Sequence, residues 1–393
     1  MNRWKNQRTR IIENQGIVMA ETKLSRQNKS GAMAKCCKDH IEQASVVILL
    51  STYNAEEYLR EQLDSLLAQT ETDWRLVVRD DGSQDNTLAI LEEYAGQYHQ
   101  ISYYSGENMG AKDSFFDLIK KIQGGQFDYV AFCDQDDYWL PEKLSRAIEL
   151  LTQFSTGEMK EEMQEDLENE LPLLYCGKPQ LVDKELSFIQ EKIKREIRPG
   201  FANALVENIV TGCTTVINRS MYEMLLKLLP EYCIMHDWWM YLVASCFGKV
   251  LYDEKPTIYY RQHGHNVMGI DESRTAELKH RVQKYKSRKS NILMQAEEFL
   301  RLVKKQGKGQ NGYGNVSSSH YKEQVHLTVH EVEDAVIRVS RKEAVNASLK
   351  RAYLVANYKK AGNRLRLAFG KVMYRQRKMD DVIFRILFLF GLR

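Results

Sequence analysis

Short apolar runs of strand length alternate with amphipathic helical segments through the first part of the chain. Residues 45–50 read Ser-Val-Val-Ile-Leu-Leu, a nearly continuous apolar run that is typical of a strand covered on both faces. Similar runs begin near Leu76, Ile101 and Tyr129, and the segments between them carry apolar residues at helical spacing. Because this alternation indicates βαβ units, the sequence predicts an α/β fold with a mainly parallel sheet flanked by helices.

Polar residues at the starts of the helical segments indicate caps. Asn54 is expected to cap the first helix, with Glu57 as its capping-box partner, and Asp85 is expected to cap the second. Pro141 falls where another helix would begin, a position that tolerates its missing N–H. Further elements are expected later in the chain: strands at 173–176, at 213–217, near Val250 and near Ile258, and a helix over 237–246.

The length of 393 residues allows one catalytic domain and one extension. Residues 1–44 are polar, lean basic and lack periodicity, so we predict a flexible tail, within which Met19 or Met33 is a possible true start. We expect the main domain over 45–270 and a helical extension over 271–393, with a polar linker near 305–320 and a basic amphipathic end. The acidic run at 155–170 is read as a solvated insert.

Composition and hydropathy limit where the protein works. The seven cysteines form no CxxC pair and have no zinc-like spacing, which fits a reducing cytosol. No stretch approaches the roughly 18 to 20 apolar residues of a membrane-spanning helix. The basic residues over 364–378 precede short apolar runs at 382–390, a pattern that suits an anionic membrane surface or, alternatively, packing on the protein's own domain or a partner. We therefore expect a cytoplasmic protein, peripheral on the inner face of the cell membrane.

The net charge of +3 is small for this length, so no nucleic-acid partner is expected. Polar motifs instead follow the predicted strands. They are Ser51-Thr52-Tyr53-Asn54, Asp80-Asp81-Gly82-Ser83-Gln84-Asp85, Asp134-Gln135-Asp136-Asp137 and His236-Asp237-Trp238-Trp239. Open α/β sheets bind ligands at the carboxyl ends of their strands. Asp134 and Asp136 would point the same way if strand geometry persists, and Mg²⁺ or Mn²⁺ favours such ligands.

The ordered set of motifs resembles the inverting glycosyltransferase family 2, built on the GT-A fold. The matching residues, within 45–270, are Ser51 to Asn54, Tyr58-Leu59, Ser65-Leu66 with Gln69, Asp80 to Ser83 with Asp85 and Thr87, Asn108-Met109-Gly110, and Asp134 to Asp136. Other residues are similar to a rhamnosyltransferase-type branch. These are Cys133 to Trp139 with Pro141 and Lys143, Thr211 to Thr214, His236 to Trp239, and Tyr260 to His263 with Asn266.

The resemblance implies a nucleoside-diphosphate sugar donor and a Mn²⁺ or Mg²⁺ cofactor. It assigns Asp136, Asp134 and His263 to the metal, with His265 as an alternative to His263. Residues implied to bind the nucleotide sugar are Thr52, Tyr53, Asn54, Asp80, Asp81, Asp134 and Arg261. A cation that bridges the diphosphate would stabilise the negative charge of the leaving group.

Inversion needs a base that takes the proton of the attacking hydroxyl, and Asp237 is the candidate. Two tryptophans beside it would desolvate the carboxylate and stack on a sugar. The residues assigned to the acceptor are Trp238, Trp239, Thr211, Gly212 and Cys213. The alternative makes Asp237 a helix N-cap and places the tryptophans in the core. The family often has an acid near the position of Gly177, and this chain departs from that pattern with Gly177-Lys178.

The predicted function is inverting transfer of rhamnose from dTDP-rhamnose to a lipid-linked or growing cell-surface polysaccharide. A UDP-hexose-dependent transferase of the same family is one alternative. A non-catalytic protein that binds sugar nucleotides or acts as a scaffold is another. The presence of Asp134, Asp136 and Asp237 disfavours the scaffold.

Overall fold

The computed structural model describes residues 44–156, 171–189, 197–263, 291–305 and 347–356, together with Met373 and Arg375. Its centre is a seven-stranded sheet with the order β3-β2-β1-β4-β8-β6-β9. The strands are β1 (Val46–Thr52), β2 (Trp74–Asp80), β3 (Ile101–Ser105), β4 (Tyr129–Cys133), β6 (Leu173–Gly177), β8 (Val216–Asn218) and β9 (Lys249–Asp253). Strands β1 to β4 are parallel, β8 runs antiparallel to β4 and β6, and β9 is parallel to β6. The prediction of an α/β fold with a mainly parallel sheet is confirmed.

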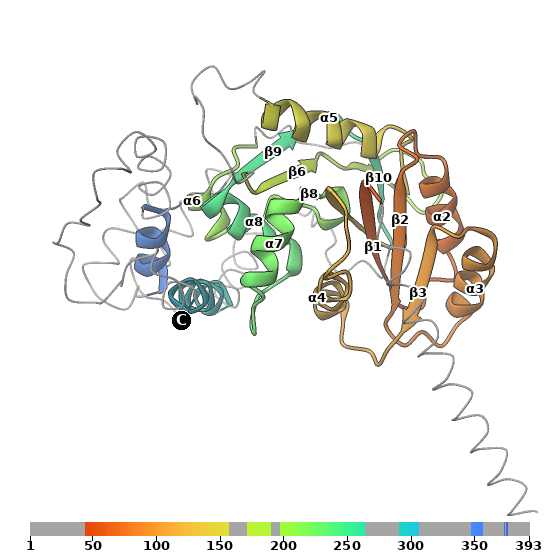
Figure 1. Ribbon diagram of the computed structural model, residues 1–393, viewed down its shortest axis with the longest axis horizontal. Helices are drawn as coiled ribbons and strands as arrows, with labels where there is room; N and C mark the ends of the chain where they lie inside the picture. Colours follow the sequence, from red (N-terminus) through yellow and green to blue (C-terminus); the bar gives the residue numbers. More distant parts are fainter. Residues whose placement is uncertain are drawn as a thin grey trace, which may run out of the picture.

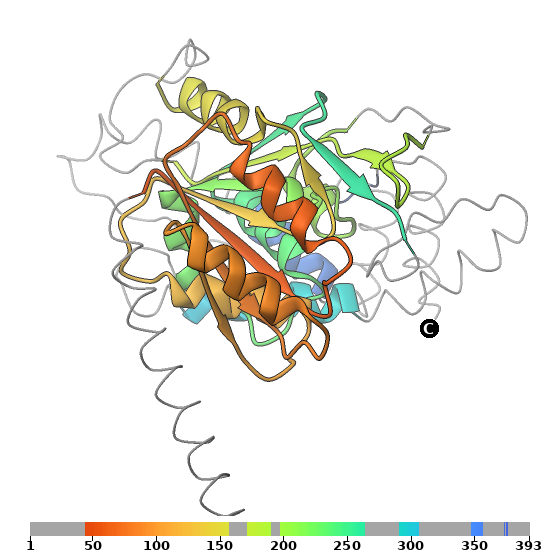
Figure 2. The ribbon, with the colours of Figure 1, turned by 90° about the vertical axis from the view of Figure 1, so that its right-hand side faces the viewer.

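Helices cover both faces of this sheet (Figure 1). They are α2 (Leu59–Leu67), α3 (Thr87–Gln97), α4 (Ala111–Lys121), α5 (Lys143–Thr156), α6 (Phe201–Ala204), α7 (Arg219–Lys227) and α8 (His236–Phe247). Alternate residues of β1 divide between two cores: Val47 and Leu49 pack with α4, α7 and α8, whereas Ile48 and Leu50 pack with α2, α3 and α5. Both faces of β1 are therefore buried, which explains its continuous apolar sequence. Figure 2 shows α2 and α3 lying across one face of the strands.

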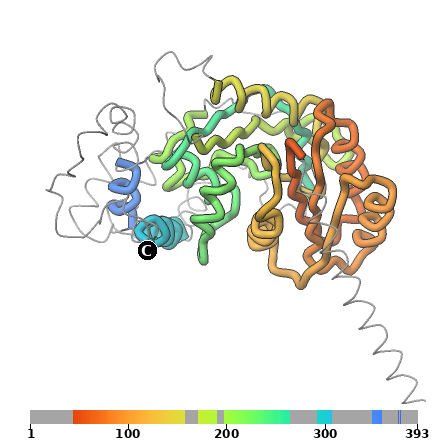
Figure 3. Tube along the Cα trace, in the orientation of Figure 1, coloured from red at the N-terminus to blue at the C-terminus, as the bar shows by residue number. Residues whose placement is uncertain are grey.

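A second, three-stranded sheet has the order β5-β10-β7. It contains β5 (Tyr138–Trp139), β10 (Ile258–Arg261) and β7 (Gln180–Val182). Because β5 follows the loop after β4 directly, pairing of β10 with β5 brings the end of β10 to that loop. The path of the chain in Figure 3 shows how this late strand returns to the half of the molecule formed by the first strands.

Two local predictions are wrong. Asn54 does not cap a helix, because α2 begins only at Leu59. Asn54 instead adopts a left-handed backbone with φ of 47°, and its side-chain oxygen accepts the N–H of Gln84. The strand expected at 213–217 begins at Val216, and Cys213 lies in the 3₁₀ turn η1 (Gly212–Thr214). Asp85 lies one residue before Asn86, the N-cap position of α3, and its side chain accepts the N–H of Thr87, the first residue of that helix.

Two further helices, at 291–305 and 347–356, fall within the predicted extension. Phe299 and Val355 from these helices are buried in the same core as Trp239 of α8. Among the described residues, no helix is both long enough and apolar enough to cross a membrane. The predicted tail, the acidic run beyond Thr156, most of the predicted linker and almost all of the basic end lie outside the described residues.

Candidate active site

The polar motifs converge where the sheet changes direction. The chain runs from β1 outward to β3 and then returns to the other side of β1 as β4, so the switch point lies between β1 and β4. A side-chain amide joins the loops that follow these two strands. Gln135 accepts the N–H of Tyr53 at 2.6 Å and donates to the carbonyl of Tyr53 at 3.2 Å. The loop after β4 is therefore fixed against the end of β1.

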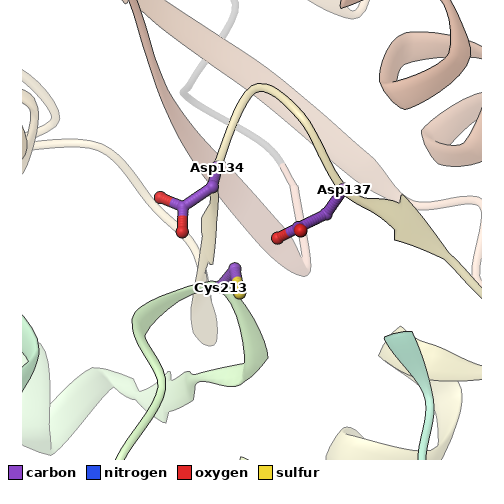
Figure 4. Close-up of side chains that lie close together, drawn as sticks. All are labelled: Asp134, Asp137 and Cys213. Atoms are coloured by element: carbon purple, nitrogen blue, oxygen red, sulfur yellow. The ribbon is translucent and has the colours of Figure 1, made fainter. Parts of the chain in front are cut away.

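Asp134, Asp137 and Cys213 form a compact acidic cluster at this point (Figure 4). One oxygen of each carboxylate and the sulfur lie within 4.8 Å of one another. Burial raises the pKa of Asp134 to about 7, and the charges of Asp136 and Asp237 act in the same direction. Burial also raises the pKa of Asp137 well above its ordinary value. Burial and the neighbouring carboxylates therefore disfavour full ionisation of this cluster.

Asp136 points to a different partner from Asp134. Its Oδ2 atom lies 2.8 Å from Nε2 of His263, and both side chains are mostly buried. The His263 ring also packs against Tyr58, with ring centroids 5.3 Å apart. The structure thus brings together Asp136 and His263, two of the three predicted metal ligands. Asp137, rather than Asp136, falls beside Asp134 because the chain turns after β4. His265 lies outside the described residues.

Arg261 is placed differently from the prediction. Its side chain is 1% exposed and forms an ion pair with Glu61 at 2.6 Å. Its Nε donates to the carbonyl of Asp136 at 2.9 Å, and its backbone N–H donates to Asp137 at 3.1 Å. The guanidinium also lies 4.4 Å from the ring centroid of Tyr58. Arg261 therefore holds the acidic loop in place. Because its guanidinium is buried and bonded to Glu61 and Asp136, it does not make the expected contact with a donor phosphate.

Asp80 and Asp81 hold the loop after β2. Asp80 is fully buried and accepts the backbone N–H groups of Gly82 and Ser83, together with the hydroxyl of Thr52 at 3.2 Å. Thr52 is also fully buried. Their direct contact with a nucleoside stays a prediction.

Asp81 pairs with the buried Arg79 and accepts the N–H of Gly110 at 2.8 Å. Tyr53 and Asn54, by contrast, are exposed at the ends of these loops. Of the residues assigned to the nucleotide sugar, these two are the ones most open to a ligand from solvent.

Asp237 is the second residue of α8 and is partly buried. Burial raises the pKa of its carboxyl to about 6, opposed by hydrogen bonds from the N–H of Trp238 and the side chain of Asn208. The predicted desolvation of this carboxylate is therefore present. Its charge also contributes to the raised pKa of Asp134. A partly buried carboxylate near the acidic cluster is suited to accept a proton.

The two tryptophans are largely part of the core. Trp239 has no exposed surface and donates its indole N–H to the carbonyl of Leu228 at 2.9 Å. Trp238 is 8% exposed and donates to the carbonyl of Ala204 at 2.7 Å. The prediction that Trp239 stacks on an acceptor sugar is wrong, because neither face of its ring is accessible. The alternative that places the tryptophans in the core describes Trp239 correctly.

The turn 211–214 packs against the start of α8. A Cβ atom added to Gly212 would lie 3.0 Å from Nε2 of His236, so a larger residue here would require a small shift of the His236 ring. The carbonyl of Thr211 accepts the N–H and the hydroxyl of Thr214. Cys213 is buried with its thiol toward Asp134 and Asp137, so it belongs to the acidic cluster and not to an acceptor surface.

Lys143 and Tyr260 lie near the acidic cluster although no role was predicted for them. Lys143 is fully buried, with Nζ 3.5 Å from the ring centroid of Trp139. Burial lowers the pKa of Lys143 to about 8, while the nearby charge of Asp137 acts in the opposite direction. Burial and the acidic cluster raise the pKa of Tyr260, so its phenol stays protonated. Lys143 lay within the matched motif, but its depth could not be read from spacing.

The residues present fit a divalent cation. Asp134 and Asp137 bring carboxylate oxygens together in one cluster, and Asp136 forms a separate pair with His263. Carboxylate oxygens and imidazole nitrogens are ligands that Mn²⁺ accepts. Burial raises the pKa of Cys213 well above its ordinary value. Its protonated thiol is therefore a poor ligand, and the carboxylates of Asp134 and Asp137 remain the main donors of the cluster.

Fold and site together define an α/β protein with an acidic ligand site at the switch point of its sheet. The sequence profile of Glycosyl transferase family 2 matches residues 47–226. The "dTDP-rhamnosyl transferase RfbG" of Shigella flexneri is 32% identical over 246 residues, which cover 58% of this chain and 77% of the relative. The chain belongs to glycosyl transferase family 2 and is a glycosyltransferase.

Other similar proteins are more distant. An uncharacterised glycosyltransferase of Rickettsia typhi, RT0329, is 26% identical over 228 residues. The match covers 56% of this chain and 64% of RT0329, so this chain spans less than two thirds of that relative. The crystal structure of S. aureus TarS 1–349 in complex with UDP-GlcNAc aligns with a TM-score of 0.46 at 14% identity, covering 88% of this chain and 91% of that one. A likeness of that degree carries no argument about activity.

Proposed function

We propose that this glycosyltransferase moves rhamnose from dTDP-rhamnose, with inversion, onto a lipid-linked or growing cell-surface polysaccharide. The observation that carries the donor is the 32% identity to a protein described as a dTDP-rhamnosyl transferase. The motifs of the rhamnosyltransferase-type branch support the same donor.

The proposed base is Asp237. With a pKa of about 6, its carboxylate is ionised at neutral pH and yet more basic than an exposed aspartate. As the acceptor oxygen bonds to the anomeric carbon, its proton passes to a carboxylate oxygen of Asp237. The bond between the anomeric carbon and the diphosphate oxygen breaks at the same time, and dTDP leaves with the electron pair.

The proposed cation site consists of Asp134, Asp136 and His263. When bound, Mn²⁺ or Mg²⁺ would neutralise charge on the diphosphate. Arg261 holds the acidic loop in place through its hydrogen bonds to Asp136 and Asp137. Tyr53 and Asn54 are proposed to contact the nucleoside.

The test is a panel of nucleotide sugars incubated with the protein, Mn²⁺ and a membrane lipid extract, with and without chelator. We expect release of nucleoside diphosphate from dTDP-rhamnose and loss of release in chelator. Turnover of UDP-hexoses alone would favour the UDP-hexose-dependent alternative. Failure to bind any donor would favour the non-catalytic alternative.

The base is tested by replacing Asp237 with Asn, and the matched control makes the same change at the exposed Asp128. We expect Asp237→Asn to abolish transfer and leave donor binding nearly intact, because the donor loops follow β1, β2 and β4. The Asp128→Asn variant should behave as the wild type. Full activity of Asp237→Asn would remove Asp237 from the role of base.

We also propose that the basic C-terminal end holds the protein at the inner face of the cell membrane. One of its residues argues for a different role, since Arg375 is 8% exposed and donates to the carbonyl of Val206. The proposal therefore rests on the remaining basic residues. Removal of residues 376–393, which takes away the apolar runs and part of the basic stretch, should weaken sedimentation with anionic vesicles, and unchanged sedimentation would overturn the proposal.

A further inference from the structure

The helix 291–305 hydrogen-bonds to the segment that leads into α8. Gln295 Oε1 accepts the backbone N–H of Ile234 at 2.9 Å, and Glu298 Oε1 accepts that of Glu231 at 2.8 Å. Both side chains are buried. The chain continues from Glu231 and Ile234 into α8, which carries Asp237. The helix 291–305 therefore holds the segment that leads to the proposed base.

The same helix also packs against α8 itself, through Phe299. The ring of Phe299 packs edge-on against Trp239 with centroids 5.9 Å apart, and it contacts Phe247 at 6.1 Å. Phe299 is fully buried. It therefore contacts α8 near both of its ends, and a shift of the helix 291–305 would move α8 and Asp237 with it.

A second contact reaches Asp237 from another direction. Arg375 Nη1 donates to the carbonyl of Val206 at 2.7 Å, and Nη2 lies 3.6 Å from the carboxylate of Glu207. The next residue, Asn208, hydrogen-bonds through its side chain to Asp237. Arg375 thus holds the segment from which this partner of Asp237 projects.

We propose that the helix 291–305 and Arg375 position Asp237 for sugar transfer, with Gln295, Glu298 and Arg375 as the positioning residues. The proposal rests on the function of Asp237 proposed above. A base must lie within hydrogen-bond reach of the acceptor hydroxyl, and a misplacement of about 1 Å can cost about a hundredfold in rate. The donor loops lie at the ends of β1, β2 and β4, so donor binding does not depend on these contacts.

The test uses the full chain with Gln295→Met and Arg375→Met. Each removes the hydrogen-bonding group while keeping a long side chain. Gln295→Glu and Arg375→Lys are the conservative partners, because each keeps an acceptor or a donor. Glu297→Gln is the matched control, since Glu297 is exposed on the same helix. The readouts are the rate of dTDP release from dTDP-rhamnose with membrane lipid extract, and the Kd of dTDP-rhamnose with Mn²⁺ by calorimetry.

We expect both methionine variants to release dTDP about tenfold to a hundredfold more slowly, with the donor Kd within about twofold of the wild type. The conservative variants should recover most of the rate, and Glu297→Gln should keep all of it. Arg375→Met should also move the acid limb of the pH–rate profile to higher pH. Arg375 holds the segment that carries Asn208, and the hydrogen bond of Asn208 lowers the pKa of Asp237.

Three results would overturn the proposal. They are unchanged rates in both methionine variants, loss of donor binding together with the rate, which would indicate general structural support, and no recovery in the conservative variants. An active Asp237→Asn variant would instead refute the assignment of the base. Wild-type rates in the methionine variants beside an inactive Asp237→Asn would refute the positioning role alone.

Discussion

Replacing Asp237 with asparagine is expected to stabilise the folded protein at neutral pH. Burial raises the pKa of Asp237 from its ordinary 3.8 to about 6. The folded state therefore binds this proton more tightly than the unfolded state does. Stability falls as pH rises from about 4 through the folded pKa, and the whole cost is present above about pH 7. Asparagine has no charge to desolvate and escapes this cost.

The magnitude follows from the shift. A difference of about 2 pKa units corresponds to about 3 kcal/mol at pH 7.5, and the same linkage gives about 1.6 kcal/mol at pH 5.0. The side-chain oxygen of asparagine can still accept the N–H of Trp238, which lies 2.6 Å from the present carboxylate. Because Asp237 keeps some contact with solvent, about 3 kcal/mol is the upper figure.

Urea unfolding at pH 5.0, 6.0 and 7.5 measures this difference, with chelator present so that cation binding does not contribute. The variant should be more stable than the wild type, and its advantage should roughly double between pH 5.0 and 7.5. Asp128→Asn, a change at an exposed carboxylate, should show no such gain. A less stable Asp237→Asn variant, or an advantage that does not change with pH, would refute the reasoning.

Three further outcomes are expected. Gly248→Ala should yield no folded protein by circular dichroism, because its Cβ would lie 1.8 Å from the backbone oxygen of Pro172. Arg261→Met should lower the free energy of unfolding in urea by about 2 to 4 kcal/mol, since the carbonyls of Asp136 and Lys184 lose their buried donor. Chelating divalent cations should weaken binding of dTDP in calorimetry, and Mn²⁺ should restore it; equal affinity in chelator would exclude the proposed cation site.

The central sheet could be predicted from the sequence because both faces of its strands are buried. Such strands read as apolar runs, and β1 and β4 begin within one residue of their predicted starts. The helix predicted over 237–246 spans His236–Phe247, since its apolar sequence is bounded by polar residues and glycine. Here burial and local sequence agree, so a short window contains enough information.

Most partners within the site could not be predicted in this way. Glu61 and Arg261 are 200 positions apart, and their ion pair depends on β10 returning to β5. The neighbour of Asp134 is Asp137 because the chain turns after β4, and strand periodicity has no bearing on such a turn. The depth of Trp239 depends on Phe299, which belongs to a segment with no recognised motif.

The positively charged side chains that are buried near this site contact other residues of the protein. Arg79 is paired with Asp81, Arg261 with Glu61, and Lys143 lies over the ring of Trp139. The two arginines hold loops in place through the carbonyls of Glu107 and Asp136, and none of the three contacts neutralises Asp134. A diphosphate that approaches the acidic cluster alone meets none of these three positive charges there. A cation bound at Asp134 and Asp136 would supply positive charge, so donor binding, and not only the rate of transfer, should depend on the metal.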